Sequence, residues 1–151
     1  MRNTLVDLIS DNTFLTIMSG VLVYIISQYY LECVINPSKE YRRLKQKIVY
    51  LLTMYSCYYR NPYNLIHENR NVRNKSEYDE ARVLFREMAS ELAGYIGILP
   101  WYRKRRKNGL QQVLSELIGI SNGFFVLPED YDTIKANKES EEKIKKMLKV
   151  K

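Results

Sequence analysis

An uncharged apolar stretch from Thr13 to Leu31 is the strongest pattern in the chain. Its nineteen residues, TFLTIMSGVLVYIISQYYL, contain no charge and no proline. At 1.5 Å per residue, a helix of this length reaches about 30 Å, the thickness of the hydrocarbon core of a bilayer. Asp7 and Asp11 precede the stretch and aromatic residues close it, unlike a cleavable signal peptide. The pattern predicts an uncleaved membrane-spanning helix; the alternative is a helix buried in a core.

The basic residues around this span predict its orientation. Arg2 is the one basic residue before it, whereas five basic residues lie between positions 39 and 47. Basic residues near the end of a span stay in the cytoplasm. We therefore expect a single-pass protein with its N-terminus outside and its C-terminus in the cytoplasm.

Small and polar residues form a stripe along one side of the predicted span. On a helical wheel they fall within an arc of about 80°. The stripe consists of Thr13, Thr16, Gly20, Tyr24 and Ser27. Such a stripe in a span faces protein or water rather than lipid. It predicts either a packing face in a homo-oligomer or, where several copies form a ring, the lining of a central pore.

After the span, apolar positions repeat every three or four residues, which predicts a helical bundle. Asn36-Pro37-Ser38 should break the helix and restart it. We expect helices over 40–60, 77–98 and 109–125, with an asparagine-rich loop over 61–75, and a short solvated helix in the charged tail. The predicted fold is all-α: an N-terminal transmembrane helix in 1–36, a small cytoplasmic helical bundle in 37–128 and a charged C-terminal tail in 129–151.

Charge changes this picture at one point. The chain carries 24 basic and 17 acidic residues, a net charge of +7, and five of the basic residues are consecutive. Two aromatic residues precede this run, which is typical of a membrane interface or of a clamp for single-stranded RNA. A solvated turn is the third interpretation. The candidate patch comprises Trp101, Arg103, Lys104, Arg105, Arg106 and Lys107.

The sequence predicts no cofactor and no metal. Two cysteines and one histidine make no zinc pattern, and a reducing cytoplasm disfavours a disulfide. The chain also lacks a glycine-rich phosphate loop and the GxSxG and HExxH motifs.

Arg60 and His67 form the pattern R-N-x5-H. It resembles the R-x(4–6)-H motif of HEPN-type ribonucleases, which are small helical bundles whose protomers bring two motifs together. The resemblance implies proton transfer by His67 and stabilisation of phosphate charge by Arg60. RNA cleavage needs a group that titrates near neutral pH and a cation at the phosphate. Pro62 would interrupt a helix carrying both residues. The alternatives are a loop histidine without catalytic use, or a structural or gating role.

Longer segments carry a second resemblance. The chain combines NTLVDLISDNTFLTIMSGVLVYIISQ, NPSKEYRRLKQKIVYLL and YYRNPY with ARVLFREMASELAGYIG and LSELIGISNGFF. The residues that carry this resemblance are Pro37, Tyr41, Leu44, Ile48 and Tyr50, the segment Arg86–Leu92 and the segment Ile118–Asn122. In these segments the chain resembles a broad group of small bacterial membrane proteins, and within it the membrane accessory proteins of type VI-B CRISPR loci, from Asn3 to about Phe125.

This resemblance implies a bacterial inner-membrane protein that strengthens RNA-guided antiphage defence. It implies a homo-oligomeric pore that depolarises the membrane once a partner RNA-guided CRISPR nuclease detects phage RNA. The alternatives are a membrane-tethered HEPN-like ribonuclease, and a membrane tether or scaffold with neither pore nor enzymatic activity. Direct RNA binding stays open.

Overall fold

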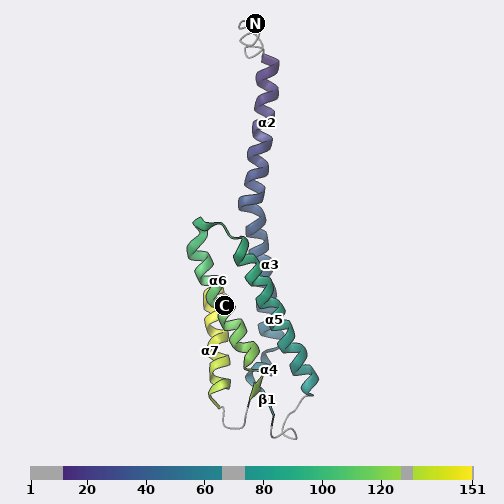
Figure 1. Ribbon diagram of the computed structural model, residues 1–151, viewed down its shortest axis with the longest axis vertical. Helices are drawn as coiled ribbons and strands as arrows, with labels where there is room; N and C mark the ends of the chain where they lie inside the picture. The colour runs from purple at the N-terminus through teal and green to yellow at the C-terminus, as the bar shows by residue number, and fades with distance from the viewer. Residues whose placement is uncertain (1–11, 66–73, 127–130, 151) are drawn as a thin grey trace. The chain divides into compact units, whose positions relative to one another are not determined.

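The computed structural model describes residues 12–65, 74–126 and 131–150. The described chain is almost entirely helical (Figure 1). It forms two units, Met1–Glu40 and Tyr41–Lys151. The predicted all-α class is confirmed: a long apolar helix lies near the N-terminus and a helical bundle follows it in the chain.

The first unit contains α2 (Asn12–Tyr30), the π-helical turn η1 (Leu31–Ile35) and the start of α3 (Asn36–Met54). The expected break at Asn36-Pro37-Ser38 is wrong. Asn36 is helical, with φ −61° and ψ −47°, and its N–H donates to the carbonyl oxygen of Leu31.

The π turn explains how the helix tolerates Pro37. A proline has no N–H, so it removes one hydrogen bond from the ladder that joins each residue to the fourth before it. A π turn joins residues five apart and widens the backbone at this point. The Ser38 hydroxyl donates to the carbonyl oxygen of Val34 at 2.6 Å, which adds a side-chain bond beside the proline.

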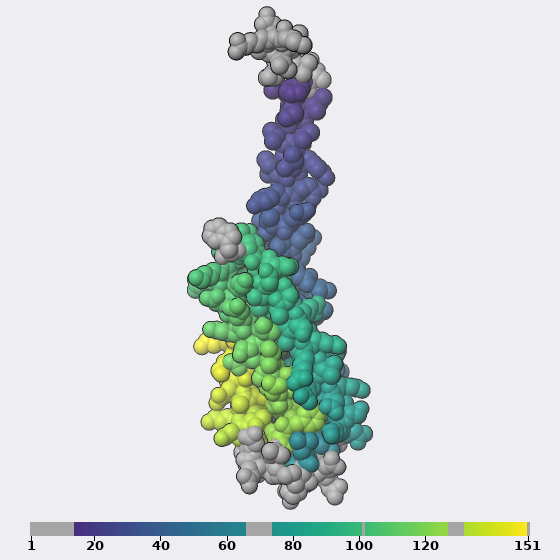
Figure 2. Space-filling model, viewed as in Figure 1, coloured from purple at the N-terminus to yellow at the C-terminus, as the bar shows by residue number. Residues whose placement is uncertain are grey.

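The second unit is a bundle built on the later part of α3, with a short connecting helix α4. Its other long helices pack in sequence order, α6 against both α5 and α7. In Figure 2 the green surface of α6 lies between teal α5 and yellow α7. The elements are α4 (Ser56–Arg60), α5 (Lys75–Ile98), η3 (Trp101–Arg103, a 3-10 turn), α6 (Lys104–Asn122) and α7 (Tyr131–Leu148).

Two helix boundaries differ from the sequence expectation. The helix expected over 40–60 is divided at Tyr55, where φ is −102° and ψ 17°. The third helix begins at Lys104 rather than Gly109. Lysine and arginine are good helix formers, so the basic run forms the first turns of α6 instead of a separate turn before it. Most of the basic run therefore lies in the first turns of α6.

A two-residue parallel strand pair closes one end of the bundle, where the sequence predicted a loop and the end of a helix. β1 (Tyr63–Asn64) pairs with β2 (Phe125–Val126). The N–H of Tyr63 donates to Phe124 at 2.8 Å and that of Leu65 to Val126 at 3.2 Å. So short a pair has no periodicity to detect.

The core of the bundle contains apolar side chains from α3, α4, α5, α6 and α7. Phe85 lies at its centre, with its ring 5.3 Å from that of Phe124 and 6.0 Å from that of Tyr59. Other fully buried members are Leu44, Ile48, Leu52, Leu92, Leu117, Ile120 and Ile144. Ile118, which the helical period placed on the buried side of α6, is exposed.

The charged tail is a structural helix, which corrects the expected short solvated one. α7 has 18 residues. Ile144 and Leu148 are 0% and 2% exposed, and they belong to the same core cluster as the other helices. The expectation was wrong because it relied on the small number of apolar residues in the tail. Ile144 and Leu148 are four residues apart, which is about one helical turn, so both lie on the same face and can be buried together.

Candidate functional site

The surface of α2 is apolar on nearly every side and finds no cover within its own chain. No residue in its most apolar 18-residue window is buried, and α2 is long and apolar enough to cross a membrane. Val23, Ile26 and Tyr29 are among its exposed large side chains. Apolar surface on this scale is stable only against lipid or other protein.

The predicted stripe lies on this exposed helix. Thr16, Gly20, Tyr24 and Ser27 are all exposed, and the side chain of Thr13 lies outside the described residues. A Cβ built on Gly20 would meet nothing within 4 Å. The amide of Gln28 donates to the hydroxyl of Tyr24 at 3.4 Å, so this side of α2 offers polar groups in a helix otherwise suited to lipid.

Arg60, the first candidate catalytic residue, lies at the end of α4 and is bound to α7. Its Nε is 3.1 Å from Oε2 of Glu141, and its Nη2 lies 2.9 Å from both carboxylate oxygens. Lys145 donates to Oε1 of the same carboxylate at 2.6 Å. The side chain of Glu141 is only 3% exposed, whereas that of Arg60 is 48% exposed.

This buried carboxylate is held charged by its neighbours. Burial alone would raise the pKa of Glu141, but hydrogen bonds from Lys145 and Arg60 lower it below its ordinary value. The same pairing raises the pKa of Arg60. Burial, reinforced by the Glu141 charge, raises the pKa of Tyr59. The ion pair therefore joins α4 to α7 and fixes the Arg60 guanidinium against a protein carboxylate.

A second polar contact beside it depends on a glycine. The amide of Asn137 donates to the carbonyl oxygens of Tyr59 and Gly123, at 2.8 and 2.9 Å. A Cβ at Gly123 would lie 2.2 Å from Oδ1 of Asn137. Glycine is thus required at position 123 because the Asn137 side chain lies where a Cβ would be.

His67 lies outside the described residues, so the structure does not show it beside Arg60. Neither Cys33 nor Cys57 forms a disulfide. Within residues 12–65, 74–126 and 131–150, no group of three metal-ligating side chains comes together.

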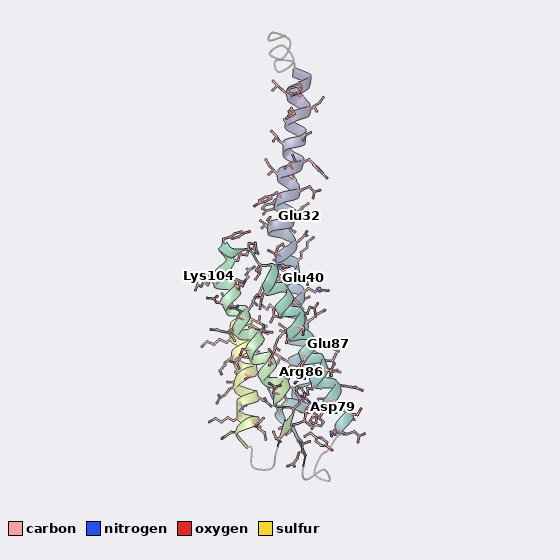
Figure 3. The ribbon with its side chains drawn as sticks, in the orientation of Figure 1. Glu32, Glu40, Asp79, Arg86, Glu87 and Lys104 are labelled. Carbon is pink, nitrogen blue, oxygen red and sulfur yellow. The ribbon has the colours of Figure 1, made fainter. Side chains whose placement is uncertain are left out.

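The basic patch on α6 lies beside tyrosine side chains of two other helices. The guanidinium of Arg106 lies 4.9 Å from the ring centre of Tyr41 on α3, within cation–π distance. Burial raises the pKa of Tyr95 of α5, and the positive charges of Arg106 and Arg103 offset part of this rise. Lys104 and Arg105 are exposed, and Figure 3 shows Lys104 pointing away from the bundle.

Sequence reasoning missed Glu141, Asn137 and Gly123. Asn137, Glu141, Ile144 and Leu148 are spaced by four, three and four residues, which is one face of a helix. That period was the available signal, but the surrounding charges concealed it. The close approach at Gly123 has no sequence signal beyond the glycine itself.

The chain matches no family model, no curated protein and no solved structure at a significant level.

Proposed function

We propose that the chain is a single-span membrane protein whose α2 helices associate through the stripe and enclose a regulated pore. The carrying observation is that residues 15–30 of α2 are all exposed within one chain. Basic residues after the span favour an N-terminus outside and a cytoplasmic bundle. From the resemblance in the sequence, we further propose that this pore lies in the inner membrane of bacteria and acts in antiphage defence beside an RNA-guided CRISPR nuclease.

Self-association is favoured by the composition of the stripe. Small residues allow helix backbones to approach closely in lipid, and hydroxyl groups bond across helices or meet water. One span per chain cannot surround a conduit, so conduction requires several copies. The bundle would then hold the copies together on the cytoplasmic side.

The ribonuclease alternative is less well supported by the geometry. Arg60 is bidentate to Glu141, so Nε and Nη2 of its guanidinium are already bound to a protein carboxylate. A catalytic role would require this ion pair to open.

Gly20→Leu is the sharpest test of the stripe. Because a side chain at Gly20 meets nothing within one chain, the substitution leaves the monomer unstrained, and any effect reports contact between copies. We expect loss of the large oligomer in detergent-corrected light scattering and loss of ion leakage from reconstituted vesicles. Ile25→Leu, on the opposite side of α2, is the matched control and should change neither.

A large oligomer with unaltered mass and leakage in Gly20→Leu would refute the stripe assignment. A wild-type monomer or dimer would refute the pore itself. In that case, replacement of α2 by an unrelated span tests for a tether, and His67→Ala tests for a dimeric ribonuclease.

A further inference from the structure

The positive charge of the protein is concentrated at one end of the bundle. Residues 41–54 and 92–115 hold nine of the 24 basic residues and none of the 17 acidic ones. The rest of the chain therefore has more acidic than basic residues. The two segments meet in space, because Arg106 of α6 lies over the ring of Tyr41 of α3. The two segments therefore carry a local excess of positive charge, which the neighbouring Glu91 offsets only in part.

The internal acidic partners at this end are few. Glu91 of α5 pairs with Arg43 at 2.6 Å and Lys47 at 2.8 Å. No ion pair within the described residues engages Lys104 or Arg105. These cations also stand at the start of α6, where the helix dipole disfavours positive charge. Their placement costs stability unless an anion approaches from outside the chain.

Apolar side chains project beside these cations. Ile98, at the end of α5, is 75% exposed, and Tyr102 of η3 is 55% exposed. Single-strand binding relies on aromatic rings as stacking platforms, whereas an exposed aliphatic side chain suits the boundary between headgroups and acyl chains. Exposed isoleucine and tyrosine among basic residues therefore fit a lipid surface better than RNA.

The end of the bundle also lies close to the span along the chain. Tyr41 is ten residues after Leu31. Even fully extended, ten residues reach at most about 36 Å. A surface containing Tyr41 is thus tethered near the membrane that α2 crosses.

We propose that Ile98, Tyr102, Lys104, Arg105, Arg106 and Lys107 form an interfacial surface that binds the headgroups of anionic phospholipids. The inference rests on the membrane span of the proposed function. The cations contact lipid phosphates while Ile98 and Tyr102 enter the headgroup layer. Arg106 is held over the ring of Tyr41. Binding fixes the bundle against the leaflet and makes its position dependent on lipid charge.

Trp101 tests this surface directly, because it is the one tryptophan of the chain. The full chain is reconstituted into vesicles of phosphatidylcholine alone, or of phosphatidylcholine with phosphatidylglycerol. With the anionic lipid we expect the Trp101 emission to shift to shorter wavelength and acrylamide quenching to fall several-fold. High salt should reverse the part of the emission shift that arises from electrostatic attraction to the anionic lipid.

Two variants separate charge from insertion. Combined Lys104→Gln, Arg105→Gln and Lys107→Gln should lose the dependence on phosphatidylglycerol, and Ile98→Ser should reduce the emission shift. The matched control is combined Lys75→Gln, Lys135→Gln and Lys138→Gln. It removes the same charge from exposed positions in the first turns of α5 and in α7, and should retain the full response.

Identical spectra in the two lipids, or an unchanged response in the patch variant, would overturn the inference. So would protection of Trp101 by single-stranded RNA in detergent without any response to phosphatidylglycerol.

Flotation with the vesicles distinguishes the two proposals. Co-flotation without a lipid-dependent spectrum rejects this surface alone, whereas failure to float with either lipid rejects the span and this surface together.

Discussion

Two helices of nearly equal length, α2 and α7, show opposite relations between composition and burial. α2 has 19 residues and no charge, and its apolar side chains are exposed. α7 has 18 residues and is mostly polar or charged, yet Ile144 and Leu148 are completely or almost completely buried.

The comparison shows that the spacing of apolar residues decides whether one face of a helix can join a core. The total apolar content decides whether the rest of the helix is stable in water or needs lipid or other protein. α7 needs only one face to join a core, because its other faces are stable in water. α2 has no broad polar face that could be exposed to water. A small bundle covers only one face of a helix, so it would leave the other apolar faces of α2 in water. Such an apolar surface is stable against lipid or other protein.

The largest effect should come from placing a charge on the buried face of α7. Ile144→Asp loses the burial of isoleucine and desolvates a carboxylate, a total of about 4 kcal/mol or more. Domains of this kind are stable by about 5–15 kcal/mol, so the bundle should be largely or wholly destabilised. Thermal unfolding in detergent micelles, followed by circular dichroism, measures it. Ile134→Asp, at an exposed position of the same helix, is the control; an equal loss there would contradict the assigned face.

Removal of the buried charge on α7 should have the next largest effect. Glu141→Gln leaves Arg60 and Lys145 without their shared carboxylate. Both cations are partly exposed and can regain water, so we expect a loss of about 1–3 kcal/mol rather than the full cost of a stranded buried charge. Glu142→Gln, which is exposed, should leave the unfolding midpoint unchanged. Equal midpoints for both variants would show that the ion pair does not hold α7.

The contrast between these helices also explains how far sequence reasoning reached. The length and apolar character of α2, and the three-and-four period of α5, predict those helices because each signal extends over many residues. The ion pair of Arg60 with Glu141 joins positions 81 apart in the chain. Tertiary packing sets such a contact, and neither residue carries a local mark of its partner. Arg60 was therefore interpreted through the nearby His67.

The pH dependence should identify the same carboxylate. A free glutamate titrates near pH 4.3, and hydrogen bonds from Lys145 and Arg60 overcome the opposing effect of burial and lower the pKa of Glu141 in the fold. A lowered folded-state pKa adds stability that is fully present above the unfolded value and is lost as pH falls through the folded value. The gap in stability between wild type and Glu141→Gln should therefore narrow below about pH 4.3. A gap that widens on acidification would reverse the sign assigned here.

Two glycines of α6 and its C-terminus should respond in opposite directions. Gly123→Ala places a Cβ against Asn137 and disturbs the hydrogen bonds to Tyr59 and Gly123, a loss of about 1–2 kcal/mol. Gly119→Ala meets only the Ser140 hydroxyl at 4.0 Å and should gain about 0.5–1 kcal/mol from helix propensity. Urea unfolding in micelles measures both. A loss of equal size at both positions would exclude the close approach at Gly123 as the cause.

The smallest effect should come from shortening an apolar side chain on α2. Ile26→Ala removes an isoleucine that is 65% exposed and lies away from the stripe, so the unfolding midpoint of the bundle should not move. The same change at Ile120, which is fully buried in α6, should cost about 2–5 kcal/mol through lost burial and a cavity. Circular dichroism in micelles compares the two. A comparable loss at Ile26 would mean that α2 packs into the bundle of its own chain, which would remove the need for lipid or other copies and with it the basis of the membrane span.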